Sequence, residues 1–205
     1  MEMNRDADER IAISRQAGAQ GIGELVDLYR NYLLLLARIE VGRRLQRKVD
    51  ASDLVQEACL EAHRCFDRFN GTTEAQFLAW LRTILARRVA KAVRHYVGTQ
   101  GRNIRQELEN DLTGSFERTG RRLADLAIPR AEHPSQQVLK REQAVLLADA
   151  LQELPPDYRE IMLLRHWEDL TFPQIAERMD RTVDSVQKLW IRALARLRTT
   201  MESAT

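Results

Sequence analysis

The spacing of the apolar residues is the feature that most constrains the fold of this chain. Between about residues 23 and 47 they recur every three or four positions, at Leu25, Leu28, Tyr32, Leu35 and Ile39. The same spacing returns from about 52 to 69, from 74 to 97 and from 136 towards the end. No segment shows a convincing alternation of apolar and polar residues, which a half-buried strand would require. The sequence therefore predicts an all-α fold.

Capping residues predict where several of these helices begin. Ser52, Thr73 and Thr182 stand at the starts of periodic segments, where a side-chain oxygen can accept a hydrogen bond from a free backbone N–H. In the sequence LPPD at 154–157, Pro155 or Pro156 suits the first turn of a helix, because that turn does not use the missing N–H. We expect a helix to start at each of these points.

The helical pattern is interrupted between about residues 98 and 134. This stretch contains Gly101, Gly114, Gly120 and Pro129 among many polar residues, a composition that indicates a loop. We therefore expect two small helical domains joined by a flexible linker that is helical in part. The predicted division is a polar N-terminal arm with a short helix at 1–20, a first helical domain at 21–97, the linker at 98–135 and a second helical domain at 136–205.

Composition is typical of a globular cytoplasmic protein. Of the 205 residues, 30% are charged and 44% are apolar, and the formal charge is only +2, so the distribution of charge is more informative than its sum. Two cysteines cannot build a disulfide framework. The first ten residues do not form a signal peptide, and the longest apolar run, 33–37, is far shorter than the roughly 20 residues that span a bilayer. We expect a cytoplasmic protein without a membrane segment.

The segment from 171 to 198 predicts a short helix, a turn and a longer helix. In the longer helix Val186, Leu189, Trp190, Ala193 and Leu197 share one side, so this side, with its tryptophan, is expected to pack on the preceding helices. This is the plan of a helix-turn-helix, whose second helix enters the DNA major groove by its N-terminal part. The alternative is an ordinary helical hairpin with a solvated outer face.

If the segment binds DNA, its outer face supplies hydrogen-bond donors suited to duplex recognition. Arginine and lysine match guanine edges, glutamine matches adenine, and flanking arginines suit phosphates. The candidate residues for this contact are Arg181, Ser185, Gln187, Lys188 and Arg192.

A second cationic surface is predicted in the first domain. Residues 75 to 106 contain no Asp or Glu, and on this helix Trp80, Arg87, Lys91 and Arg94 share a stripe beside the apolar face. A cationic stripe with an aromatic residue suits single-stranded nucleic acid, which needs phosphate neutralisation and a flat surface for an unstacked base. Two alternatives stay open, namely that Trp80 belongs to the core and that the arginines form a solvated face.

The helix from about 52 to 69 carries an acidic outer face. Asp53, Gln56, Glu57 and Glu61 point outward, and Leu60 is exposed among them. Such a face suits docking of a basic partner protein around a small apolar contact. Ion pairs within the helix, with the arginines that follow, are the alternative explanation.

The sequence gives little support for catalysis or metal binding. Cys59, His63 and Cys65 are close together, but they do not share one helical side and lack a fourth ligand. Core packing explains the cysteines better. We find no phosphate-binding glycine loop and no nucleophile–base arrangement. The prediction is a protein that is not an enzyme and needs no metal or cofactor.

These features, in this order, resemble the bacterial RNA polymerase sigma factors, specifically the compact extracytoplasmic-function (ECF) group. DASDLVQEACLEAHRCFDRF at 50–69 resembles the family's DLVQE helix, and FLAWLRTILARRVAKAVRHY at 77–96 resembles its promoter-melting segment. Residues 151–198 resemble the family's C-terminal promoter-reading domain; their sequence is LQELPPDYREIMLLRHWEDLTFPQIAERMDRTVDSVQKLWIRALARLR. The resemblance covers about three quarters of the chain and leaves out the N-terminal arm and the linker.

The resemblance implies a role for each surface. The acidic helix would bind the basic coiled-coil of the largest subunit of core RNA polymerase, through Asp53, Gln56, Glu57 and Leu60. The C-terminal helix would read the minus-thirty-five element as duplex. The unwound minus-ten strand would be held by the FNGTT loop at 69–73 and the basic helix, through Asn70, Trp80, Arg87, Arg88, Lys91 and Arg94. An anti-sigma factor would be a further partner.

The chain departs from the family pattern at several positions. After ILAR the family usually has Asn, where this chain has Arg88, and Lys91 replaces a common acidic residue. In the C-terminal helix, Leu189 and Trp190 replace Arg and Leu of many relatives. Two alternatives to a sigma factor stay open: an autonomous helix-turn-helix regulator whose first domain senses a ligand or dimerises, and a helical interaction protein that binds no DNA.

Overall fold

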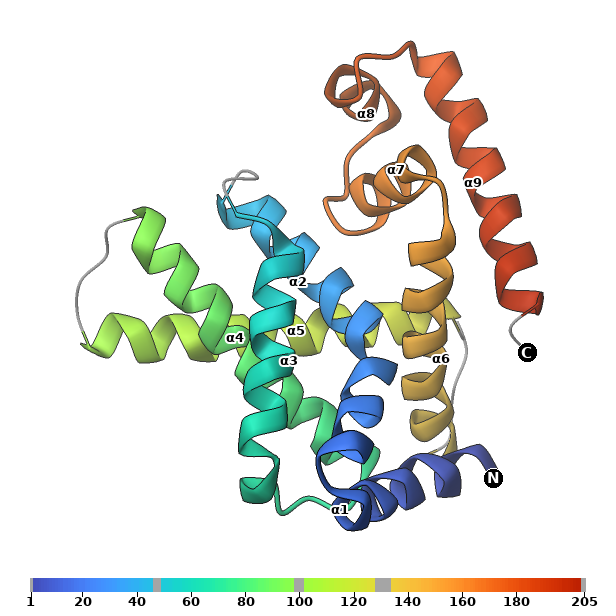
Figure 1. The fold of residues 1–205 in the computed structure, drawn as a ribbon. Helices are drawn as coiled ribbons and strands as arrows, with labels where there is room; N and C mark the ends of the chain where they lie inside the picture. Colours follow the sequence, from blue (N-terminus) through green and yellow to red (C-terminus); the bar gives the residue numbers. More distant parts are fainter. Residues whose placement is uncertain (1, 46–48, 98–101, 128–133, 204–205) are drawn as a thin grey trace. The chain divides into compact units, whose positions relative to one another are not determined.

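The computed structural model describes residues 2–45, 49–97, 102–127 and 134–203, and the regular structure within these ranges is entirely helical (Figure 1). This confirms the predicted all-α fold. The chain forms two compact units, Met1–Val145 and Leu146–Thr205.

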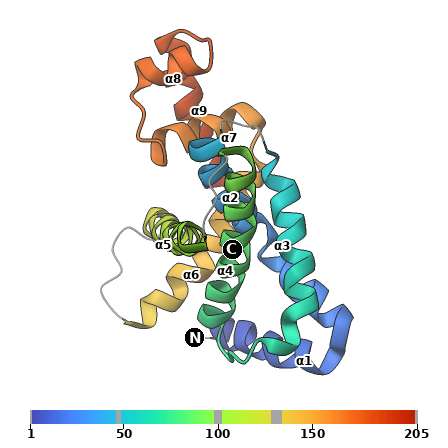
Figure 2. The ribbon, with the colours of Figure 1, turned by 90° about the vertical axis from the view of Figure 1, so that its left-hand side faces the viewer.

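The first unit is built from α1 (Glu2–Leu28), α2 (Arg30–Leu45), α3 (Ala51–Cys65), the short 3-10 helix η1 (Phe66–Arg68), α4 (Glu74–Val97) and α5 (Arg102–Ala127). Helices α2, α3 and α4 pack on one another (Figures 1 and 2). Leu36, Phe77 and Leu85 are completely buried among them. Each such side chain contributes about 1.5–3 kcal/mol by leaving water, so this packing holds α3 and α4 in fixed register.

Three of the predicted helix starts are confirmed and one is corrected. The hydroxyl of Thr73 accepts a hydrogen bond from the N–H of Gln76 at 3.3 Å, and that of Thr182 accepts one from Ser185 at 3.2 Å. Pro156 is the first residue of its helix. Helix α3, however, is capped by Asp50 rather than Ser52, because the Asp50 carboxylate accepts the Ser52 N–H at 2.8 Å.

The N-terminal segment is more ordered than the predicted polar arm. Helix α1 runs from Glu2 to Leu28 with a kink at Gly18, whose φ of 66° lies in the left-handed region that glycine adopts readily. Before the kink, Ile11 and Ser14 are buried. The part of α1 from Asp8 to the kink is therefore packed into the first unit. In both ribbon views α1 lies beside the connection between α3 and α4 (Figures 1 and 2).

Residues 102–127 are not the polar linker that the sequence predicts. They form α5, which packs against α4, with Leu112, Phe116 and Leu123 completely buried. Ser115 donates a buried hydrogen bond to Glu40 of α2 at 2.6 Å. Within the predicted linker, residues 98–101 and 128–133 lie outside the described residues.

The second unit contains the C-terminal part of α6 (Pro134–Glu153), then α7 (Pro156–His166), α8 (Phe172–Arg178) and α9 (Val183–Ser203). Arg159 of α7 donates to the free carbonyls of Leu151, Gln152 and Leu154 at the end of α6, at 2.6–3.0 Å. Among the helices of the described residues, none has the length and apolar character needed to cross a membrane.

Candidate nucleic-acid and protein interfaces

Helices α8 and α9 form the predicted helix-turn-helix. Thr171 and Gln174 make a capping box at the start of α8, and Asp180 takes the turn with a φ of 51°, a conformation that aspartate tolerates better than most residues. Ile175 of α8 and Val186 of α9 are completely buried at the contact between the two helices. This contact holds the start of α9 at a fixed angle to α8.

The inward side of α9 agrees with the prediction from its periodicity. Val186, Leu189 and Ala193 are buried, whereas Trp190 is half-buried and its ring lies 5.2 Å from that of His166 and 6.3 Å from that of Phe172, between ring centroids. The tryptophan therefore packs on α7 and α8 instead of facing a ligand.

The outer side of α9 presents most of the predicted duplex-contacting residues. Gln187, Lys188 and Arg192 are exposed, and Ser185 is half-buried. Lys188 is paired with Asp184 one turn earlier, at 2.6 Å between Nζ and Oδ2. Such exposed pairs are worth less than about 1 kcal/mol, so a phosphate or a base edge can replace the aspartate.

Arg181 is placed differently from the other duplex candidates. It precedes α9, and its Nη2 lies 2.5 Å from Oδ2 of Asp157 in the first turn of α7. Both side chains reach the surface, and the bond links the turn of the helix-turn-helix to α7. Only Nη2 takes part in this pair, so Nε and Nη1 of Arg181 keep N–H groups that can donate to DNA.

The cationic stripe of α4 is exposed. Arg87 and Lys91 are exposed and Arg94 is half-buried. Within the described part of the chain none of the three forms an ion pair. Their positive charge is therefore available to an anionic partner.

Trp80 belongs to an aromatic cluster and not to an open platform. Its ring centroid is 5.1 Å from that of Phe69, 5.7 Å from Phe77 and 6.2 Å from Phe66. The side chain is half-buried, so only part of the indole can meet a base. This geometry favours the alternative in which Trp80 mainly packs the core.

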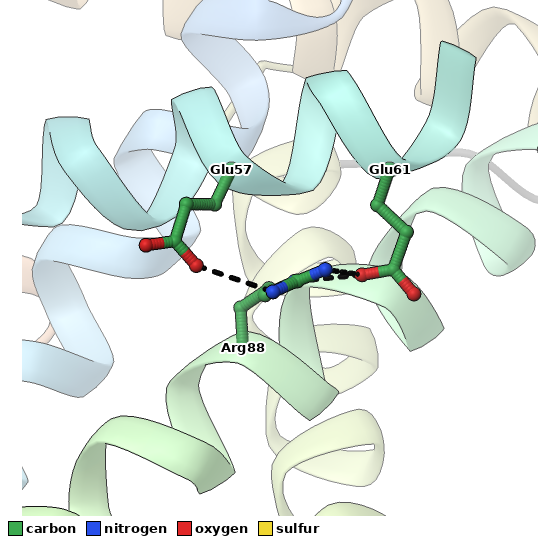
Figure 3. A network of polar contacts seen from close by, with 3 residues as sticks. All are labelled: Glu57, Glu61 and Arg88. Atoms are coloured by element: carbon green, nitrogen blue, oxygen red, sulfur yellow. Dashed lines mark hydrogen bonds and ion pairs between the residues drawn. The ribbon is translucent and has the colours of Figure 1, made fainter. Parts of the chain in front are cut away.

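Arg88, which the family resemblance adds to the strand-binding candidates, is placed differently from the residues of the stripe. Its Nε donates to Oε2 of Glu61 at 2.6 Å, and Nη1 lies 3.2 Å from Oε2 of Glu57 (Figure 3). With only 27% of the side chain exposed, Arg88 joins α4 to α3. Its guanidinium is already occupied, which disfavours the predicted role in strand binding.

The loop between η1 and α4, residues 69–73, is held in a defined conformation. Asn70 is exposed at the surface. Arg15 of α1 donates to the carbonyls of Phe69 and Gly71 at 2.9 and 2.5 Å, and Gln76 accepts the N–H of Thr72 at 2.8 Å. Sequence reasoning did not identify Arg15, because no local pattern connects residues 54 positions apart.

The acidic surface of α3 is smaller than the sequence suggests. Asp53 and Gln56 are exposed and Leu60 is 51% exposed, but Glu57 and Glu61 share Arg88. The free acidic part therefore lies at the N-terminal end of α3, around Asp53. Leu60, the exposed apolar residue of this helix, lies about two turns further along α3.

The residues considered for metal binding do not come together. Cys59 and Cys65 are half-buried and unpaired with each other, and His63 is exposed. Burial raises the pKa of the Cys59 thiol. No group of His, Cys, Asp and Glu suited to a metal ion occurs among the described residues.

Comparison with known proteins assigns both units. The family model described as Sigma-70 region 2 matches residues 28–97, and that described as Sigma-70, region 4 matches residues 144–197. The ECF RNA polymerase sigma-E factor of Haemophilus influenzae is 30% identical over 87% of this chain and 86% of its own length. The chain belongs to the ECF RNA polymerase sigma factors. Proteins of the same description from Escherichia coli and Salmonella typhi are 28% and 27% identical, each over 80% of this chain and 81% of its own length.

This sigma factor binds core RNA polymerase, recognises promoter DNA and promotes strand opening for transcription initiation. The region 2 match covers α2, α3, the 69–73 loop and α4, and the region 4 match covers the helix-turn-helix. Most of α1 and all of α5 lie outside both matches.

Proposed function

We propose that this sigma factor divides its work among three surfaces. The N-terminal end of α3 binds the coiled-coil of the largest polymerase subunit, α4 with the 69–73 loop holds the unwound minus-ten strand, and the outer side of α9 reads the minus-thirty-five duplex. The observation that carries the proposal is the separation of charge between neighbouring helices: Asp53 is exposed on α3, whereas Arg87 and Lys91 are exposed on α4 without an acidic partner in the described residues.

The strand-binding surface is supported by its chemistry. Exposed arginine and lysine neutralise phosphates independently of sequence, and the exposed Asn70 of the loop offers an amide that can both donate to and accept from a base edge. Unpaired bases expose these edges fully. We therefore assign charge neutralisation to Arg87, Lys91 and Arg94 and base recognition to Asn70.

The duplex-reading surface is supported by the geometry of the helix-turn-helix. The buried contact between α8 and α9 leaves Gln187, Lys188 and Arg192 on the free side of α9, as in proteins that place this helix in the major groove. Ser185 and Arg181 lie at the N-terminal end of the same surface, and we place them at the edge of the contact.

The polymerase-binding surface is proposed around Asp53, Gln56 and Leu60, with Glu57 contributing through the oxygen that does not face Arg88. A carboxylate near a helix N-terminus and an exposed leucine further along the same helix suit a basic helical partner. RNA synthesis itself is assigned to the polymerase, so this subunit acts in the cytoplasm as an initiation factor and not as an enzyme. An anti-sigma factor stays a prediction from the family.

Run-off transcription with core polymerase over a random promoter library tests this proposal. We expect transcripts only when sigma factor and core polymerase are both present, with enriched sequences at two promoter elements. Tight binding of a duplex operator by a dimer of this protein, without any effect on core polymerase, would instead identify an autonomous helix-turn-helix regulator.

A further inference from the structure

The 69–73 loop, FNGTT, is not part of a helix, so helical hydrogen bonds do not pair its backbone N–H and C=O groups. A loop of such residues ordinarily samples many conformations, and binding a strand would then cost the entropy of ordering it. In this protein the loop is ordered before any strand is present, and its contacts show how.

Part of the order comes from residues adjacent in sequence. The Gln76 side chain accepts the N–H groups of Thr72 and Thr73 at 2.8 and 3.3 Å. The Phe69 ring folds back under the loop so closely that a Cβ on Gly71 would lie 2.4 Å from its Cζ. These contacts hold the second half of the loop and its base.

The remaining contacts come from α1. One guanidinium nitrogen of Arg15, Nη2, donates to the carbonyl of Phe69 at 2.9 Å and to that of Gly71 at 2.5 Å. The central carbon of this guanidinium, Cζ, lies 5.7 Å from the centre of the Phe69 ring. The two carbonyls flank Asn70 on either side, so Arg15 fixes the backbone from which the Asn70 side chain projects.

Helix α1 is itself attached to the start of α4. The Glu74 N–H donates to Oδ1 of Asp8 at 2.8 Å, and Tyr29, directly after α1, donates to Oε1 of Glu74 at 3.0 Å. Burial raises the pKa of the Tyr29 phenol far above its usual range, which keeps it a hydrogen-bond donor. Arg15 therefore lies between two residues, Asp8 and Tyr29, that both hydrogen-bond to Glu74, the first residue after the loop.

We propose that Arg15 is a positioning residue for minus-ten recognition, and that residues 8–17 of α1 serve to hold the 69–73 loop so that Asn70 faces an unpaired base. This inference rests on the proposed function of the loop and assigns a role to a segment that lies outside the region 2 match. Arg15 acts through the backbone of the loop and not through contact with the DNA. Its loss therefore impairs discrimination between bases and leaves phosphate binding intact.

The test uses holoenzyme and promoter templates whose minus-ten region is mismatched, with the non-template strand randomised there. Pre-opening the duplex separates base recognition from melting. The base preference among the templates that initiate is compared for the unmodified protein and five variants: Arg15→Ala, Arg15→Lys, Asn70→Ala, the double variant Arg15→Ala with Asn70→Ala, and Gln16→Ala. Gln16 is an exposed neighbour of Arg15 on the same helix and serves as the control.

Arg15→Ala is expected to reduce the preference at one minus-ten position by roughly tenfold, the range of a lost base contact. Asn70→Ala should reduce the preference at the same position, and the double variant should lose no more than either single one, because both act through one contact. Arg15→Lys should restore part of the preference, since an ammonium can still donate to one carbonyl. Gln16→Ala should behave as the unmodified protein.

Several outcomes would overturn the inference. One is an unchanged base preference in Arg15→Ala, and another is additive losses in the double variant. A third is an equal loss of binding on all sequences, with the slope of log K against log salt concentration reduced by about 0.7, because that result marks a direct phosphate contact. If Arg15→Ala lowers the thermal unfolding midpoint of the protein, the base preference of Arg15→Lys is compared with that of the unmodified protein instead. Failure of the unmodified protein to initiate with core polymerase would instead reject the proposed function.

Discussion

At the scale of single residues, the ion-pair partners of an arginine indicate whether it is available to bind DNA or stabilises the fold. Arg87 is exposed and has no acidic partner in the described residues, whereas its neighbour Arg88 is held by Glu57 and Glu61. Consecutive positions on a helix point about 100° apart, so adjacent arginines meet different surroundings. The two residues therefore make a matched pair for experiment.

Arg88→Ala is expected to lower the free energy of unfolding by about 1–2 kcal/mol, because it leaves two carboxylates of α3 without their charged hydrogen-bond donor. Arg87→Ala should change stability by less than about 0.5 kcal/mol but should weaken binding of single-stranded DNA. Urea denaturation and oligonucleotide titration measure the two effects. Equal stability of the two variants would contradict the link between α3 and α4.

Lys188→Ala on α9 is expected to cost about 1–3 kcal/mol in binding of the preferred minus-thirty-five duplex if Lys188 contacts a base edge. Arg198→Ala serves as the control, because Arg198 is exposed near the C-terminal end of α9 and pairs with Glu202. Duplex binding by holoenzyme at fixed salt measures both. A similar loss on every sequence would mark Lys188 as a phosphate contact.

At the scale of elements, α5 shows how small residues let a polar-looking segment pack as a helix. Between the buried Leu112, Phe116 and Leu123, the same side of α5 carries Thr119 and Gly120. Gly120 faces α2 so closely that an added Cβ would lie 2.4 Å from the Tyr32 hydroxyl. The helix can approach its neighbours because these positions lack bulk.

Gly120→Ala should therefore destabilise the protein by about 1–3 kcal/mol, as overpacking does. Gly114→Ala on the same helix is the matched control, because its added Cβ would come no closer than 3.4 Å to the Arg118 side chain. That change should stabilise α5 by about 0.5–1 kcal/mol, since alanine loses less backbone entropy in a helix than glycine. Thermal or urea unfolding compares the two, and a destabilisation of equal size in both would exclude the steric explanation.

At the scale of the whole molecule, one chain carries surfaces for a protein partner and for nucleic acid, and these lie on different elements. The acidic part of α3 that is free of internal pairing lies around Asp53, and the unpaired cations of α4 lie around Arg87 and Lys91. A variant that alters one surface should therefore leave the other functions intact.

Asp53→Lys is expected to weaken the binding of core polymerase by more than tenfold, because it places a cation against a basic partner. Glu107→Lys, an equal change of charge at an exposed position of α5, is the control for net charge. Co-migration of sigma factor and core polymerase on gel filtration reports the result, and circular dichroism checks the fold. Equal binding by the two variants would remove Asp53 from the polymerase interface.

The sequence by itself determined the features that depend on local periodicity and chemistry. The helical class, the caps at Thr73 and Thr182, and the inward Val186 and Leu189 of the helix-turn-helix follow from the 3.6-residue repeat and from side chains that hydrogen-bond to nearby backbone. Tertiary structure decided the packing of α5, the pairing of Arg88 with α3 and the contact of Arg15 with the 69–73 loop. These features join residues that are distant in sequence, so they exist only once the helices have packed and no local pattern records them.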